Sequence, residues 1–243
     1  MTRFFVAPEE LLPEFLTLTG ENAKHAKVLR LKEGEEVLVC DGQGRECVCV
    51  VSDMSDGQVS LVVHSRQESA NEAAVRVSVY MAFPKSDKLE HVIQKATELG
   101  VYEIVAFPSA RCVSRPDDKS IKKKLERWQK IAASAAEQSG RGLIPQVVVL
   151  PSYDAALKRA ALAQKAILFY ENERAVTLRM SLQSGSYETI SLLTGPEGGL
   201  EPAEVEKARE AGLDICTLGK RILRCETAPL CALSAVMYHA GEF

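Results

Sequence analysis

The chain has 243 residues, of which 46% are hydrophobic and 26% are charged, and its formal net charge at pH 7 is −3. This composition is typical of a globular protein and excludes disordered, collagen-like and coiled-coil chains. Apolar runs such as 147–150 are far too short to cross a bilayer, so we expect no membrane association. The apolar run before Pro8 has only four residues, fewer than a signal peptide requires.

The seven cysteines stand at irregular spacing and include no Cys-x-x-Cys pair. A zinc ribbon needs such paired cysteines, and a disulfide framework uses an even number of them, so we expect neither. The cysteine pattern therefore predicts reduced thiols, a cytoplasmic location and no metal centre.

The first 72 residues predict a small antiparallel β-barrel. Five stretches are rich in β-branched and aromatic residues, as strands usually are: 3–7, 15–19, 35–40, 46–54 and 58–65. Turn-forming residues at 41–44 and 55–57 separate the later strands. Residues 21–34 have helical spacing, and Gly34 is expected to end that helix. This part of the chain is acidic, with seven basic and thirteen acidic residues.

After a polar linker at 67–74, strands and helices alternate. The expected strands are 75–83, 101–107, 145–150, 166–171 and 188–195, and the expected helices are 86–100, 117–140, 201–212 and 226–240. This alternation predicts a parallel sheet with helices on both faces. Six basic residues and one acidic residue lie in Lys119–Lys130, which is either a solvated helix face or a contact for a polyanion.

Ligands of parallel sheets bind beyond the carboxyl ends of the strands, and three such ends are unusual here. Gly195-Pro196-Glu197-Gly198-Gly199 follows the strand at 188–195, and its glycines permit close approach of the backbone to a ligand. The motif is neither the Rossmann fingerprint nor a P-loop. The second, 218–228, combines two arginines and a lysine with Ile222 and Leu223, which suits a ring-bearing ligand. The third, Phe83–Lys88, is uninformative alone.

These segments occur together with others in a recognisable order. GPEGG is followed by LGKRILRCETA, and upstream stand HAKVLRLKEGEEVLVCDGQG, QKATELGV and ERWQKIAASAAEQSGR. In this order they closely resemble the ribosomal small-subunit RNA methyltransferase E family of bacteria, which forms N3-methyluridine in 16S ribosomal RNA and belongs to the SPOUT superfamily. The resemblance covers essentially the whole chain.

The resemblance implies a PUA-like RNA-binding β-barrel over residues 1–72. It implies an α/β SPOUT methyltransferase domain over residues 73–243, ending in a deep trefoil knot. Pattern reasoning alone would exclude a knot, because true knots are nearly absent from proteins. The resemblance further implies S-adenosylmethionine as cofactor, the 16S RNA of the small ribosomal subunit as partner, and a homodimer with active sites near the subunit interface.

Two sets of residues are then expected to hold the donor and to perform the chemistry. The cofactor-binding candidates come from the two late loops: Leu193, Thr194, Gly195, Pro196, Glu197, Gly198, Gly199, Leu218, Gly219, Ile222 and Leu223. Methylation of uridine N3 requires loss of the imide proton, through a general base or through cations that stabilise the developing anion. Arg224 and Glu226 are candidates for these roles, and Glu137 and Arg141, from the same chain or its partner, are alternatives.

Basic residues are the candidates for RNA contact, because cationic side chains hold phosphates. They are Lys24, His25, Lys27, Arg30, Lys85, Lys122, Lys123 and Arg221. Three other functions stay open. The chain could be an RNA-binding ribosome-assembly protein without enzymatic activity, another nucleotide-ligand enzyme on a doubly wound sheet, or a SPOUT methyltransferase of another ribosomal or transfer RNA nucleotide.

Overall fold

The computed structural model describes residues 1–55, 57–114, 116–183 and 185–243. Its contacts divide the chain into two compact units, one made of residues 1–72 and 136–144 and the other of residues 73–135 and 145–243. The sequence analysis placed residues 136–144 in the second domain. In the structure these residues cluster with the first unit, because their backbone is hydrogen-bonded to it. Gly44 N–H donates to the Gly142 carbonyl (3.2 Å), and Ile144 N–H donates to the Gly42 carbonyl (3.0 Å).

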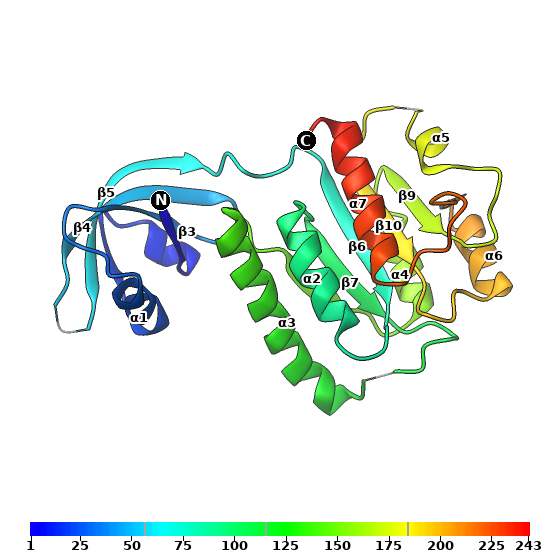
Figure 1. Cartoon of the computed structure of the whole chain (residues 1–243), viewed down its shortest axis with the longest axis horizontal. Coiled ribbons are helices and arrows are strands. Elements are labelled where there is room, and N and C mark those ends of the chain that lie inside the picture. Colours follow the sequence, from blue (N-terminus) through cyan, green and yellow to red (C-terminus); the bar gives the residue numbers. More distant parts are fainter. Residues whose placement is uncertain (56, 115, 184) are drawn as a thin grey trace. The chain divides into compact units, whose positions relative to one another are not determined.

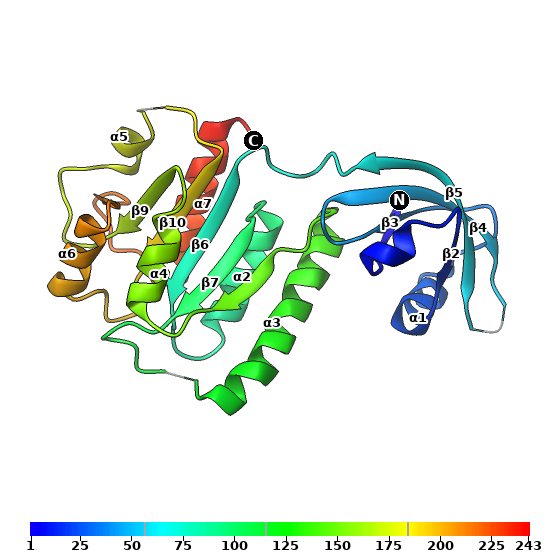
Figure 2. The ribbon, with the colours of Figure 1, turned by 180° about the vertical axis from the view of Figure 1, so that it is seen from behind.

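The first unit is a curled five-stranded sheet with two short helices (Figures 1 and 2). Its elements are β1 (Thr2–Phe5), η1 (Pro8–Leu11), β2 (Phe15–Leu18), α1 (Gly20–Val28), β3 (Glu36–Cys40), β4 (Arg45–Asp53) and β5 (Val59–Glu68). The strand order is β1-β3-β4-β5-β2. The prediction of an antiparallel barrel was wrong in one respect, because β1 runs parallel to β3 and the sheet is mixed. Helix α1 ends at Val28, before Gly34, because Arg30 adopts a left-handed conformation (φ 57°).

A buried ion pair lies within this first sheet. Arg3 of β1 and Glu46 of β4 are 7% and 4% exposed, and their Nη1 and Oε2 atoms are 2.6 Å apart. Gln67 donates to the other carboxylate oxygen of Glu46 (2.9 Å). Burial alone would raise the pKa of Glu46, but the hydrogen bonds from Gln67 and Arg3 outweigh it and lower that pKa.

The second unit contains a six-stranded sheet whose pairings are all parallel, as the alternating pattern predicted. Its elements are β6 (Arg76–Ala82), α2 (Lys88–Glu98), β7 (Glu103–Phe107), α3 (Asp118–Ser139), β8 (Gln146–Val149), α4 (Tyr153–Ala160), β9 (Lys165–Phe169), α5 (Leu178–Leu182), β10 (Thr189–Thr194), α6 (Pro202–Glu210), β11 (Asp214–Cys216) and α7 (Thr227–Ala240). The strand order is β11-β9-β10-β6-β7-β8. The last four residues of α3 are counted with the first unit.

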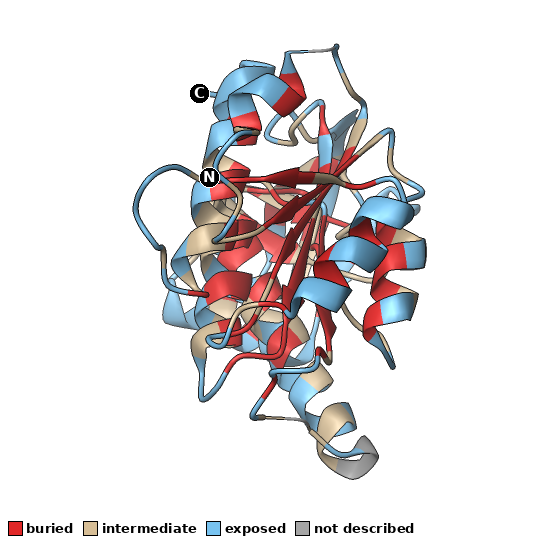
Figure 3. Cartoon of the chain, turned by 90° about the vertical axis from the view of Figure 1, so that its right-hand side faces the viewer, coloured by how far each residue is buried: buried red, intermediate tan, exposed pale blue. Residues whose placement is uncertain are grey.

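The core of the second unit is the sheet itself, whose inner strands β6, β7, β9 and β10 are mostly buried (Figure 3). Helices α2 and α7 cover one face, and α4 lies on the other (Figures 1 and 2). Helix α2 shows why the sequence folds this way, since Leu89, Val92 and Ile93 recur at helical spacing and are all buried. Because every strand runs in the same direction, the carboxyl ends of β9, β10 and β11 meet at one edge of the sheet.

Candidate functional site

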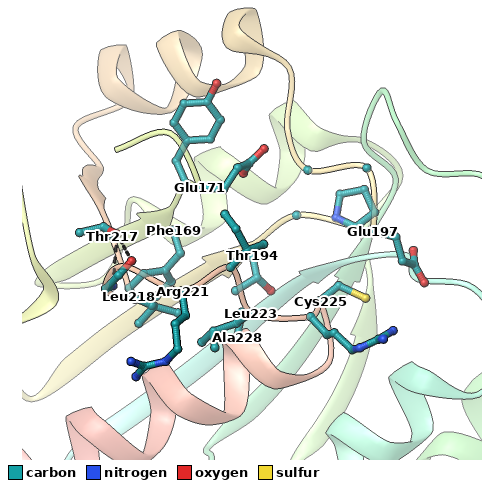
Figure 4. A pocket seen from close by; sticks show the side chains of 18 of the residues that line it. Phe169, Glu171, Thr194, Glu197, Thr217, Leu218, Arg221, Leu223, Cys225 and Ala228 are labelled. Carbon is teal, nitrogen blue, oxygen red and sulfur yellow. Dashed lines mark hydrogen bonds between the residues drawn. The ribbon is translucent and has the colours of Figure 1, made fainter. Parts of the chain in front are cut away.

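A cavity of about 430 Å³ lies where these strand ends meet (Figure 4). Three segments form most of its wall: residues 169–171 after β9, residues 194–199 at the end of β10, and residues 217–225 after β11. Lys88 and Ala228 complete it. The volume falls within the range of small-molecule sites.

The three glycines of the glycine-rich loop lie close to the side chains of other residues. Gly199 has a left-handed conformation (φ 69°), and a Cβ there would collide with the carboxylate of Glu171. A Cβ on Gly198 would lie 3.2 Å from Cβ of Arg111, whose guanidinium donates to the Gly198 carbonyl (3.0 Å). A Cβ on Gly195 would lie 3.0 Å from Leu200. A side chain at any of these three positions would have to displace a neighbour, so glycine suits the loop there.

The segment after β11 forms the facing wall. Thr217 anchors its start, because its hydroxyl bonds the backbone N–H and carbonyl of Gly219 (3.2 and 3.1 Å; Figure 4). Leu218 and Leu223 supply apolar surface, and Ile222 is 70% exposed although it is aliphatic. An exposed aliphatic side chain on a cavity wall is suited to cover the flat face of a bound ring.

A charged cluster closes one end of the cavity, where Glu197 and Cys225 lie on the same side (Figure 4). The ammonium of Lys88 lies 3.0 Å from Oε1 of Glu197 and 3.2 Å from Oε2 of Glu226. The Cys225 thiol lies 3.2 Å from the Glu226 carboxylate. We call Lys88, Glu197, Cys225 and Glu226 the lysine cluster.

The electrostatics of the lysine cluster favour its ionised carboxylates. Burial alone would raise the pKa of Glu197, but the Lys85 backbone N–H and the Lys88 ammonium outweigh it and lower that pKa. Burial alone would also raise the pKa of Glu226, but hydrogen bonds from its own backbone N–H, the Cys225 thiol and Lys88 outweigh it and lower that pKa. Burial and the neighbouring carboxylates raise the pKa of Cys225 to about 12, so this side chain is a thiol at neutral pH.

Most of the predicted cofactor-binding residues come together in this cavity. Ten of them line it: Thr194, Gly195, Pro196, Glu197, Gly198, Gly199, Leu218, Gly219, Ile222 and Leu223. Leu193 does not line it and is 1% exposed. Its position within β10, paired with Leu168 and Tyr80 of the neighbouring strands, places it in the core of the sheet.

The four predicted catalytic residues separate into two groups. Arg224 lines the cavity, and Glu226 reaches its wall through Lys88 and Cys225. Glu137 and Arg141 belong to the first unit and do not line the cavity. Arg141 is 4% exposed and donates to Glu72 from Nε (3.1 Å) and Nη2 (2.7 Å), which gives it a structural position.

The predicted RNA-binding residues lie in several places. Lys24, Lys27 and Arg30 are exposed on the first unit, where His25 pairs with Glu137 (3.1 Å). In the second unit the exposed residues are Lys85, Lys122, Lys123 and Arg221. Arg221 alone among these also lines the cavity.

The sequence analysis missed seven lining residues: Lys88, Phe169, Tyr170, Glu171, Thr217, Cys225 and Ala228. The residues after β9 could have been found, because the predicted strand at 166–171 ends beside the glycine-rich loop in any parallel sheet. Thr217 follows β11, which the sequence did not reveal. Within the described ranges, no three His, Cys, Asp or Glu side chains are grouped to hold a metal ion, and no helix has the length and apolar run needed to span a bilayer.

Comparisons with known proteins show the family of the chain. A family model for an RNA methyltransferase domain matches residues 71–237, and one for an RNA methyltransferase PUA domain matches residues 18–63. The chain is 40% identical to ribosomal RNA small subunit methyltransferase E of Bacillus subtilis, over 98% of this chain and 96% of that protein. It is 34% identical to the protein of that name from Mycobacterium bovis, over 89% of this chain and 84% of that protein.

A solved structure matches nearly the whole chain. The crystal structure of a ribosomal RNA small subunit methyltransferase E from Neisseria gonorrhoeae, bound to S-adenosylmethionine, matches with a TM-score of 0.86 and 31% identity over 98% of each chain. The similarity therefore extends over both units. The chain belongs to the ribosomal RNA small subunit methyltransferase E family.

Proposed function

We propose that the protein transfers a methyl group from S-adenosylmethionine to N3 of a uridine in the 16S RNA of the small ribosomal subunit. One observation carries the proposal, namely that the glycine-rich loop at 194–199 and the arginine-bearing segment at 217–225 line one cavity. The bound donor of the Neisseria gonorrhoeae relative supports the choice of cofactor. A cytoplasmic location follows from a ribosomal substrate.

The cavity residues fit such a donor. The loop at 195–199 has glycine at three positions, where no side chain stands between its backbone and a ligand, and backbone groups of this loop are suited to bond the edge of an adenine. Leu218, Ile222 and Leu223 would cover the ring. Glu171 follows β9 on the cavity wall, and its carboxylate is suited to accept hydrogen bonds from the hydroxyls of a bound ribose. When bound, S-adenosylmethionine supplies an electrophilic methyl group.

The chain's own residues must position the uridine and manage its imide proton. Arg224 lines the cavity, and its guanidinium is suited to stabilise negative charge that develops on the carbonyl oxygens beside N3. Glu226 is less suited to act as general base, because its lowered pKa makes its carboxylate a weak proton acceptor. We therefore assign charge stabilisation to Arg224 and an orienting role to Glu226.

Arg224→Ala is expected to lower the single-turnover methylation rate about a hundredfold, since it removes one stabilising donor from the transition state. The affinity for S-adenosylhomocysteine, measured by calorimetry, should stay within about threefold of the wild-type value, a difference below about 1 kcal/mol. Arg221→Ala is the matched control, because this arginine stands on the same wall and is assigned to RNA binding. It should raise KM for the RNA more than it lowers the rate. An unchanged rate in Arg224→Ala would contradict the assignment.

RNA binding is proposed for cationic side chains of both units. Lys24, Lys27 and Arg30 are exposed on the first unit beside the half-buried His25, and Lys122 and Lys123 are exposed on α3 of the second. Each would contact phosphates rather than bases. The acidity of the first 72 residues makes such local patches necessary for binding a polyanion.

A homodimer and a trefoil knot complete the proposal. Helix α7 contains no Asp, Glu, Lys or Arg and leaves Cys231, Ala235 and Tyr238 exposed, which supports a second copy packed against it. Light scattering of wild type and Tyr238→Lys tests this, with a monomeric wild type as the contrary result. The approach of the loops at 194–199 and 217–225 supports the knot, which an experimental chain trace through residues 189–243 would test.

The decisive experiment maps the modified nucleotide. Small subunits from a strain that lacks the protein should contain one unmethylated uridine in 16S RNA, and purified protein with S-adenosylmethionine should restore the methyl group at N3. Mass spectrometry of nuclease fragments identifies both base and position. Methylation of another nucleotide, or RNA binding without any affinity for S-adenosylhomocysteine, would replace this function with one of its alternatives.

A further inference from the structure

The lysine cluster joins three parts of the chain that are distant in sequence. Lys88 is the first residue of α2, Glu197 lies in the glycine-rich loop, and Glu226 is the N-cap of α7. The Lys88 ammonium bonds both carboxylates (3.0 and 3.2 Å) and also contacts the Cys225 thiol (3.7 Å). One side chain thus connects the two walls of the cavity.

The backbone beside Lys88 adds to this connection. The N–H of Lys85 donates to Oε1 of Glu197 (3.0 Å), the same oxygen that accepts from Lys88. The side chains of Lys88, Glu197 and Glu226 are 26%, 28% and 21% exposed, so the ion pairs are partly open to solvent. Partly buried, doubly paired groups of this kind hold their geometry better than a surface pair does.

We propose that Lys88 is a positioning residue for the donor cavity, which ties the loop at 195–199 to the start of α7 through Glu197 and Glu226. This inference rests on the proposed function, since it assigns the residue that holds the donor site in shape. Without the ammonium, two carboxylates would face each other at one end of the cavity, and their repulsion would separate the loops. Lys88 itself need not touch the donor.

Calorimetry with S-adenosylhomocysteine on the full-length protein tests the proposal. Lys88→Met should weaken binding about tenfold, because it removes charge-assisted hydrogen bonds to both walls. Lys88→Arg keeps the charge and should remain within about threefold of wild type, since a guanidinium also pairs with two carboxylates. Lys95→Met is the matched control on the same helix, because Lys95 pairs with Glu98 (2.8 Å), one turn away and outside the cavity wall, and it should bind like wild type.

Two further measurements separate positioning from a general loss of structure. The effects of Lys88→Met and Glu226→Gln should not add in the double variant, because both changes act on one ion pair. In the ligand-free protein, hydrogen exchange should accelerate together at Gly199, Thr227 and Ala228 in Lys88→Met. Their N–H groups donate within the two tied segments, to the carbonyls of Pro196 and Arg224 (2.9 Å each).

The outcomes distinguish this inference from the proposed function. Wild-type affinity in Lys88→Met, an equal loss in Lys95→Met, or unchanged exchange in both segments would overturn the positioning role and leave the methyltransferase function standing. Failure of the wild-type protein to bind S-adenosylhomocysteine would overturn the function instead. The exchange experiment would then still decide whether Lys88 ties the two segments.

Discussion

Gly199→Ala should weaken the binding of S-adenosylhomocysteine by about a hundredfold. Two effects combine, because the residue has a left-handed conformation (φ 69°) and its new Cβ would collide with the Glu171 carboxylate. A non-glycine residue held in that conformation costs about 1–3 kcal/mol, and the new Cβ must also displace the Glu171 carboxylate from its place on the cavity wall. Calorimetry measures the affinity, and circular dichroism verifies that the fold persists.

Gly212→Ala provides the matched control. Gly212 has a similar left-handed conformation (φ 87°), but no atom lies within 4 Å of the Cβ it would gain. It therefore carries the backbone strain without the collision, and donor affinity should be unchanged. If both variants bound equally well, the close packing of the glycine-rich loop would have no bearing on ligand binding.

Glu46→Ala should destabilise the first unit by about 3–5 kcal/mol, because it leaves the buried Arg3 guanidinium without its carboxylate. Hydrogen exchange in peptides from β3 and β4 measures the loss within this unit. Glu36→Ala is the control, since Glu36 is exposed on β3 and its removal should change little. Equal exchange in the two variants would show that the ion pair does not stabilise the sheet.

The same pair predicts a dependence on pH. The pKa of Glu46 is lowered in the folded protein, so its contribution to stability is fully present above the ordinary carboxyl pKa and is lost as the pH falls through the lowered value. The stability difference between wild type and Glu46→Gln should accordingly be largest near neutral pH and should disappear in acid. A difference that grows on acidification would contradict this sign.

Much of the second unit could be predicted because its strands and helices are long and regular in pattern. Short elements gave no such signal. Strand β11 has three residues and includes Asp214, a poor strand former. It is held by contacts that a local pattern cannot show, since Lys165 of β9 and the Ser181 hydroxyl of α5 both bond the Asp214 carboxylate (2.5 Å each). Because β11 was not predicted, Thr217, which follows it, was not included in the predicted site.

The candidate site was predictable where motif residues form the wall, and not where a residue acts through distant partners. Lys88 stands in an unremarkable stretch, and its importance comes from two carboxylates more than a hundred positions away. Leu193 was wrongly expected to line the cavity for a different reason. Strand β10 is buried on both faces, so its sequence has no alternation of polar and apolar residues that would distinguish a cavity residue from a core residue. Arg141 looked catalytic in its segment, and its bonds to Glu72 depend on the tertiary fold.

The return of residues 136–144 to the first unit has a consequence for synthesis on the ribosome. Glu72 accepts hydrogen bonds from Gly142 N–H (2.9 Å) and Leu143 N–H (3.0 Å), so the N-terminal unit lacks these bonds until its distant segment has been translated. By then β6, β7 and α3 have also been made. The N-terminal unit therefore lacks these hydrogen bonds until residues 73–143 have been synthesised.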